Sequence, residues 1–78
     1  MTKLSREMSG KEVVKALQRA SFCVKRRKGS HIVLRRDSSF AQVVVPEHKS
    51  IDTGTLASIL DGADLSTEDF IKLLKQFT

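Results

Sequence analysis

One short basic segment contains the residues whose types and spacing favour chemistry. The sequence RKGSHIVLRR, residues 27–36, places His31 directly after a glycine and a serine. Histidine can accept and release a proton near neutral pH, so it can serve as a general base in the cell. RNA carries its own nucleophile, the 2′-hydroxyl, and a base that removes its proton lets the oxygen attack the adjacent phosphorus. His31 is therefore the candidate catalytic residue for a cleavage of RNA that requires no metal.

Groups beside His31 could stabilise the negative charge that develops on phosphorus in such a reaction. The Lys28 ammonium, the Gly29 backbone N–H and the Ser30 hydroxyl are suitable types, because each donates hydrogen bonds to an anionic oxygen. DNA lacks the 2′-hydroxyl, so this chemistry would select RNA. The candidate RNA-binding residues, all in or beside this segment, are Lys25, Arg26, Arg27, Lys28, Gly29, Ser30 and Arg35.

The charge of the chain is divided unevenly between its two halves. Residues 1–36 contain eleven basic and two acidic residues, a net charge of +9, whereas residues 37–78 contain three basic and seven acidic residues, a net charge of −4. A basic cluster favours binding to phosphate or to an acidic protein, and a solvated surface is the alternative. The chain has four Phe, no Trp and no Tyr, which argues against a nucleic-acid site built on stacked aromatic rings.

The other residues that could carry chemistry give weaker signals. A lone histidine is also compatible with an exposed strand position without function, so this alternative stays open for His31. His48 follows a strand-ending proline and is better interpreted as a loop residue with a structural hydrogen bond. The two histidines lack the spacing of a metal site, and the single cysteine, Cys23, can form neither an internal disulfide nor a cysteine-rich zinc site. We therefore expect no metal and no small-molecule cofactor.

Capping residues and apolar spacing predict three helices. Residues 9–12, SGKE, form a capping box at the start of a helix over about residues 10–20. Asp52 is the expected N-cap of a second helix, and Gly62 suits the position just past its end. Ser66 begins a sequence that resembles a capping box, followed by apolar residues at helical spacing.

Alternating residues between the first two helices predict three strands. They cover residues 22–26, 30–36 and 40–45, with turns at residues 27–29 and 37–39 and with Pro46 ending the third strand. Gly29 is free to take a positive φ in the first turn. The side chains expected to face the helices are Phe22, Val24, Ile32 and Leu34. Those expected on the open face are His31, Val33 and Arg35.

The order of elements predicts an α+β fold. Short links between the strands imply an antiparallel three-stranded sheet, and the simplest packing covers one of its faces with the helices. Residues 9–78 would form a single domain after a loose arm of residues 1–8. No apolar run resembles a signal peptide or a membrane span, which predicts a cytoplasmic location without membrane contact.

Four sequence motifs, in order, resemble those of the HicA toxin family. They are SGKEVVKALQRASF, KGSHIVLRR, VVVPEHKSIDTGTLASIL and LSTEDFIKLL, and together they cover about residues 9–74. The chain contains all four parts of the family pattern, which are a GSH strand start, a V-P-x-H strand end, a G-T-L-x-x-I-L helix and an acidic L-S-x-E-x-F segment near the end. The resemblance implies a fold like that of the double-stranded-RNA-binding domain (dsRBD-like), with the order α-β-β-β-α(-α).

The resemblance also implies an activity and partners. It suggests an endoribonuclease toxin, an mRNA interferase, that cleaves mRNA and arrests growth. The family's catalytic histidine is the one in GSH, which is His31 here. The expected partner is a HicB-type antitoxin that binds the toxin and blocks this surface. The sequence departs from common family patterns at residues 37–39 and 51–53, which bear on antitoxin fit and RNA preference more than on activity.

Two other classes of function are alternatives. A non-catalytic RNA-binding module of the same fold would bind RNA without cleaving it. A protein-interaction subunit would use its basic face for an acidic partner and would bind no RNA even at low salt, where phosphate contacts are strongest.

Overall fold

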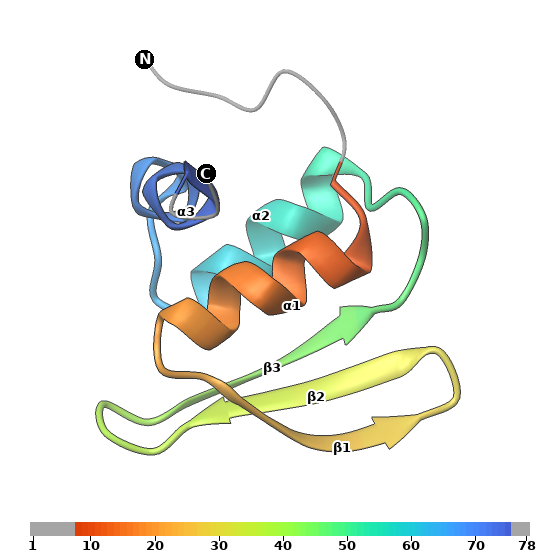
Figure 1. Cartoon of the computed structure of the whole chain (residues 1–78), viewed down its shortest axis with the longest axis horizontal. Coiled ribbons are helices and arrows are strands. Elements are labelled where there is room, and N and C mark those ends of the chain that lie inside the picture. The colour runs from red at the N-terminus through yellow and green to blue at the C-terminus, as the bar shows by residue number, and fades with distance from the viewer. Residues whose placement is uncertain (1–7, 76–78) are drawn as a thin grey trace.

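The computed structural model describes residues 8–75 as six elements of an α+β fold. The elements are α1 (Gly10–Arg19), β1 (Cys23–Lys28), β2 (His31–Arg36), β3 (Ala41–Pro46), α2 (Thr53–Gly62) and α3 (Thr67–Lys75). The strands pair antiparallel in the order β1-β2-β3, and the helices lie on one side of this open sheet (Figure 1). The expected fold class, the antiparallel sheet and the one-sided helical layer are confirmed.

Helix α1 begins at the predicted capping box and lies close to the end of β3. The Ser9 Oγ accepts the Glu12 backbone N–H at 3.2 Å, and the Glu12 carboxylate accepts the Ser9 N–H at 3.0 Å. The Gly10 N–H donates to the His48 carbonyl oxygen at 2.9 Å. A Cβ atom at Gly10 would overlap the Pro46 carbonyl oxygen, so this close approach requires glycine.

The hydrophobic core lies between the sheet and the helices. Ile32 and Leu34 of the central strand β2 face the helices and are almost completely buried, as the alternation predicted. Other large, fully buried side chains are Phe22, Phe70, Leu17, Val13 and Val45. Because β2 is paired along both edges and packed on one face, the backbone of its first residue, His31, has a fixed position.

Helix α2 begins at the predicted N-cap, Asp52. Its carboxylate accepts the Thr55 hydroxyl at 2.6 Å and the Thr55 backbone N–H at 3.2 Å. The hydrogen bond from the hydroxyl, followed by that from the backbone, lowers the pKa of Asp52, because both stabilise the charged carboxylate. Gly62, expected just past the helix, is instead its last residue. At the start of α3, the Ser66 Oγ accepts the Asp69 backbone N–H at 3.0 Å.

The first hairpin has a shorter turn than the sequence predicted. Strand β1 begins one residue later than expected and continues to Lys28, so the turn contains only Gly29 and Ser30. Strand β3 likewise extends through Pro46. All six residues of β1 are exposed, so the strand has no alternation of buried and exposed side chains. Without that alternation, the end of the strand could not be located from the sequence.

Val24 lies on the face of the sheet that the sequence predicted, but it is partly exposed there. It pairs with Leu34 and therefore lies on the helix side of the sheet, but 40 % of its surface is exposed. A β-bulge at Lys25 follows it in this edge strand. The prediction that Val24 faces the helices is confirmed, but the residue is not buried, because the buried positions of the sheet lie in β2 and β3 and the edge strand β1 is exposed.

Met8 belongs to the folded domain rather than to a loose arm. Residues 1–7 of the expected arm lie outside the described residues. Met8 is buried and forms an antiparallel bridge with Ile51, whose N–H donates to the Met8 carbonyl oxygen at 2.7 Å. This backbone contact links the entry to α1 with the loop that precedes α2.

Candidate nucleic-acid interface

The strand pairing determines which candidate residues share a face. In an antiparallel sheet, directly paired residues point to the same side. The relevant pairs are Lys28 with His31, Arg26 with Val33, and Cys23 with Arg35. Ile32 and Leu34, which alternate with the β2 residues of these pairs, are buried under the helices. All three pairs therefore lie on the open face, as the alternation of β2 predicted for His31, Val33 and Arg35.

Lys28 and His31 are brought together by the Gly29–Ser30 turn. Gly29 has a φ of +59°, the positive value that the sequence predicted for this turn. Direct cross-strand partners have Cβ atoms about 5 Å apart, so the ammonium and imidazole groups can reach the same phosphate. Both residues are exposed, and among residues 8–75 the His31 side chain has no hydrogen-bond partner.

The loop after β3 supports this turn. The Glu47 N–H donates to the Ser30 carbonyl oxygen at 2.6 Å, and the Glu47 carboxylate forms an ion pair with Arg27. The next residue, His48, has an exposed side chain and a carbonyl that accepts the Gly10 N–H, so the loop joins the hairpin to α1. Sequence reasoning missed Glu47, because it lies 20 residues from Arg27 and no local pattern connects them.

Arg27 lies on the opposite face of the sheet from His31. It pairs with Ile32, a core residue under the helices, and therefore points to the helix side. Lys25 occupies the bulge, where the register of β1 against β2 shifts. The predicted RNA-binding residues are thus divided between two faces of one edge strand.

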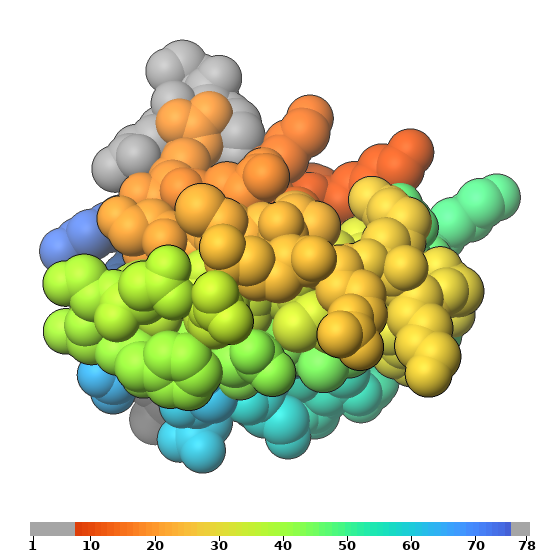
Figure 2. All heavy atoms as spheres, turned by 90° about the horizontal axis from the view of Figure 1, so that it is seen from below, coloured from red at the N-terminus to blue at the C-terminus, as the bar shows by residue number. Residues whose placement is uncertain are grey.

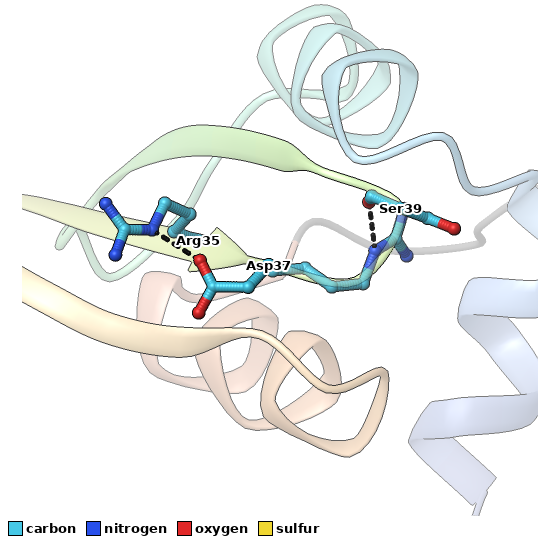
Figure 3. Close-up of polar contacts among 4 residues, drawn as sticks. Arg35, Asp37 and Ser39 are labelled. Carbon is cyan, nitrogen blue, oxygen red and sulfur yellow. Dashed lines mark hydrogen bonds and ion pairs between the residues drawn. The ribbon is translucent and has the colours of Figure 1, made fainter.

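Arg35 shares the open face with His31 but lies at the other end of β2. Arg35 is four positions after His31 in an extended strand, a distance of about 13 Å. The Arg35 Nε donates to the Asp37 carboxylate at 2.9 Å, and the neighbouring Arg36 Nε donates to the Ser39 carbonyl oxygen at 2.9 Å (Figure 3). The ion pair with Asp37 offsets the charge of Arg35, so unpaired positive charge on this face is concentrated near Lys28.

The exposed side of the sheet has two distinct ends. Figure 2 shows β1 as an orange-to-yellow band across this side, with the β1–β2 turn at the right and the β2–β3 turn, in green, at the left. Four consecutive β1 residues, Lys25 to Lys28, are basic and exposed. Of these, Arg26 and Lys28 point to the open face, and their positive charge favours phosphate groups there.

Three further observations concern the part of the chain that the structure describes. No group of three His, Cys, Asp or Glu side chains within residues 8–75 is placed to hold a metal ion. No helix in the same range is long and apolar enough to cross a membrane. Cys23 is a free, exposed thiol.

Comparison with known proteins identifies a family. A family model described as the HicA toxin of bacterial toxin–antitoxin systems matches residues 10–65, more than two thirds of the chain. The matched range runs from the first residue of α1 to the segment just before α3, and it includes every candidate residue. No match was found among curated proteins.

Proposed function

Because the chain belongs to the HicA family of toxins from bacterial toxin–antitoxin systems, we propose that it is an endoribonuclease that cleaves mRNA in the cytoplasm and arrests growth. His31 is the general base, and Lys28, the Gly29 N–H and the Ser30 hydroxyl bind the reacting phosphate. The observation that carries the proposal is the direct cross-strand pairing of Lys28 with His31 on the open face. A proton acceptor and a cation at one phosphate are the two groups that this reaction needs.

The proposed reaction uses the nucleophile that RNA supplies. Neutral His31 accepts the proton of the 2′-hydroxyl while the 2′-oxygen forms a bond to the adjacent phosphorus. The bond from phosphorus to the 5′-oxygen breaks, the 5′-oxygen takes a proton from water, and the hydroxide left behind takes the proton from His31, which restores the neutral imidazole. The products are a 2′,3′-cyclic phosphate and a 5′-hydroxyl. Lys28 stabilises the additional negative charge on the phosphate oxygens in the transition state.

The other open-face cations bind the flanking RNA in this proposal. Arg26 lies two residues before Lys28 in β1 and points to the same face, so it meets a neighbouring phosphate. Arg35 contributes less, because Asp37 already pairs with it. Lys25, in the bulge, adds positive charge at the edge of the sheet.

The proposal includes a HicB-type antitoxin as the protein partner. Membership of the family implies an antitoxin. An acidic surface on that partner would complement Arg26 and Lys28 on the open face and would cover His31 directly. Inhibition then follows from blocking access to the site, with the fold of the toxin unchanged.

Inducible expression of the wild type beside His31→Ala tests the proposed activity. The wild type should arrest growth with loss of mRNA in the same cells, and the variant should do neither. The His31 side chain is exposed, so the purified variant should keep the melting temperature of the wild type. A folded variant that still degrades mRNA would contradict the role of His31.

A non-catalytic RNA-binding module is the second candidate, and one observation favours it. Among residues 8–75, no side chain hydrogen-bonds to His31, whereas a general base is commonly oriented by a third group. This candidate is supported if the wild type binds RNA, leaves it intact and does not affect growth. RNA cleavage by the purified wild type that is abolished in His31→Ala excludes it.

A further inference from the structure

A basic depression lies on the helix side of β1, on the opposite face of the sheet from His31. It has a volume of about 220 Å³ and lies between α1, β1 and the loop after β3. One wall is a single face of α1, since Lys11, Val14, Lys15 and Gln18 recur at positions i, i+3, i+4 and i+7. Arg27 and Glu47 line it from the other side, and Ile32 completes the lining.

The charges in this depression favour an anion. Lys11 and Lys15 are exposed, and neither has an ion-pair partner among residues 8–75. Arg27 donates one N–H of its guanidinium to Glu47, which leaves further donors of that planar group available. With three cations and one carboxylate, the lining has a net positive charge, and the half-buried Val14 provides apolar contact area beside it.

The depression and the His31 site share one strand as their boundary. Arg27 and Lys28 are consecutive in β1, so their side chains point to opposite faces, the first into the depression and the second beside His31. β1 is an edge strand of the sheet, and all six of its residues are exposed. A flexible chain can therefore cross this edge and contact both places.

We propose that this depression binds the phosphate backbone of the same single-stranded RNA whose scissile phosphate lies at His31, an inference that rests on the proposed ribonuclease function. A positively charged groove that follows the backbone is the usual means of holding a single strand without sequence readout. A stiff A-form duplex cannot bend around one β-strand, so the two places together select single-stranded RNA over double-stranded RNA. Lys11, Lys15 and Arg27 are the binding residues in the depression.

Charge-neutral variants of the two lysines test this inference. Lys11→Gln and Lys15→Gln, made singly and together, retain helix propensity, and Lys72→Gln on α3 is the control for the same loss of charge. Binding is measured from low to high salt on a single-stranded RNA of about twelve nucleotides, 2′-O-methylated so that the nucleophile is absent. For each lysine that binds a phosphate, the substitution should lower the slope of log K against log salt by about 0.7, and the control should leave the slope unchanged.

A second measurement compares substrate lengths on unmodified RNA. The wild type should have a higher kcat/KM on an RNA of about twelve nucleotides than on a trinucleotide that fills only the His31 site. The variant with both Lys11→Gln and Lys15→Gln should cleave the two RNAs with similar kcat/KM. An unchanged salt slope and an unchanged advantage of the longer RNA would overturn the inference, while cleavage by the wild type would leave the proposed function standing. A wild type that neither binds nor cleaves any RNA would contradict both. If the lysine substitutions weaken binding of the antitoxin but not of RNA, the depression binds a protein partner, and the inference is overturned.

Discussion

Lys28 and His31 are direct partners across the β1–β2 hairpin, with only Gly29 and Ser30 between them in the chain. The hairpin alone determines that the two residues pair, but the face of the sheet to which they point depends on packing against the helices. Ile32 is buried under the helices, and this burial fixes the direction of the residues on either side of it. A slip of the register by one residue would turn His31 to the opposite face.

Replacing Lys28 with glutamine should slow RNA cleavage. The variant keeps a hydrogen-bond donor but loses the charge that stabilises the phosphate in the transition state. We expect a fall in kcat of about tenfold, less than the ~10²–10³ typical of donors in enclosed sites, because solvent screens this exposed position. Lys72→Gln is the matched control, and equal rates for the two variants would remove Lys28 from the mechanism.

Cleavage should persist in EDTA and should leave a 2′,3′-cyclic phosphate. The expectation follows from the proposed reaction, in which His31 and Lys28 supply the proton acceptor and the positive charge. Mass spectrometry of the cleaved RNA identifies the terminal group, and the rate with and without EDTA tests the metal requirement. A strict dependence on Mg²⁺, or a 3′-hydroxyl product, would contradict the mechanism.

Gly29→Ala should destabilise the protein through backbone strain alone. The φ of +59° is unfavourable for a residue with a Cβ atom, although among the described residues only Gly29 itself and its chain neighbours could lie within 4 Å of the place where that atom would be. The expected cost is about 1–2 kcal/mol in the free energy of unfolding, measured by denaturant titration. Ser30→Ala, at the other turn position, should change this free energy less. A stability unaffected by Gly29→Ala would mean that the turn adopts another conformation.

Lowering the pH should reduce the stability of the protein by protonating Asp52, the N-cap of α2. Its pKa is lowered from the ordinary value of 3.8, so the charged carboxylate stabilises the folded state above that value, and the contribution is lost as pH falls through the folded-state pKa. Asp52→Asn keeps one oxygen that can accept the Thr55 backbone N–H, loses the second acceptor oxygen, and does not titrate. The difference in melting temperature between wild type and variant should therefore shrink as pH is lowered from 6 to below about 4. A constant difference would show that the charge does not contribute.

The parts of the fold that the sequence predicted are those with strong local signals. The Ser9–Glu12 capping box and the Asp52 cap set the starts of two helices, and both are present. The open-face position of His31 followed from the burial of Ile32 and Leu34, which the alternation of β2 displays directly. These features depend on residues within a few positions of each other, where spacing alone carries the information.

The parts that sequence could not predict depend on contacts between distant residues. The ion pair of Arg27 with Glu47, and the depression beside it, require the loop after β3 to lie against β1. A run of four basic residues does not reveal which of them point to which face, because the bulge at Lys25 shifts the alternation. The exposure of Val24 likewise depends on how far the helical layer extends over the sheet.

The ion pair between Arg35 and Asp37 makes the charge of the open face uneven along the strands. It leaves one end of the open face nearly neutral, while Arg26 and Lys28 make the other end positive. The face therefore carries a gradient of electrostatic potential along the strands. If the chain acts on RNA as proposed, this gradient would draw an RNA that lands on the face toward His31, and added salt would slow the encounter by screening the gradient.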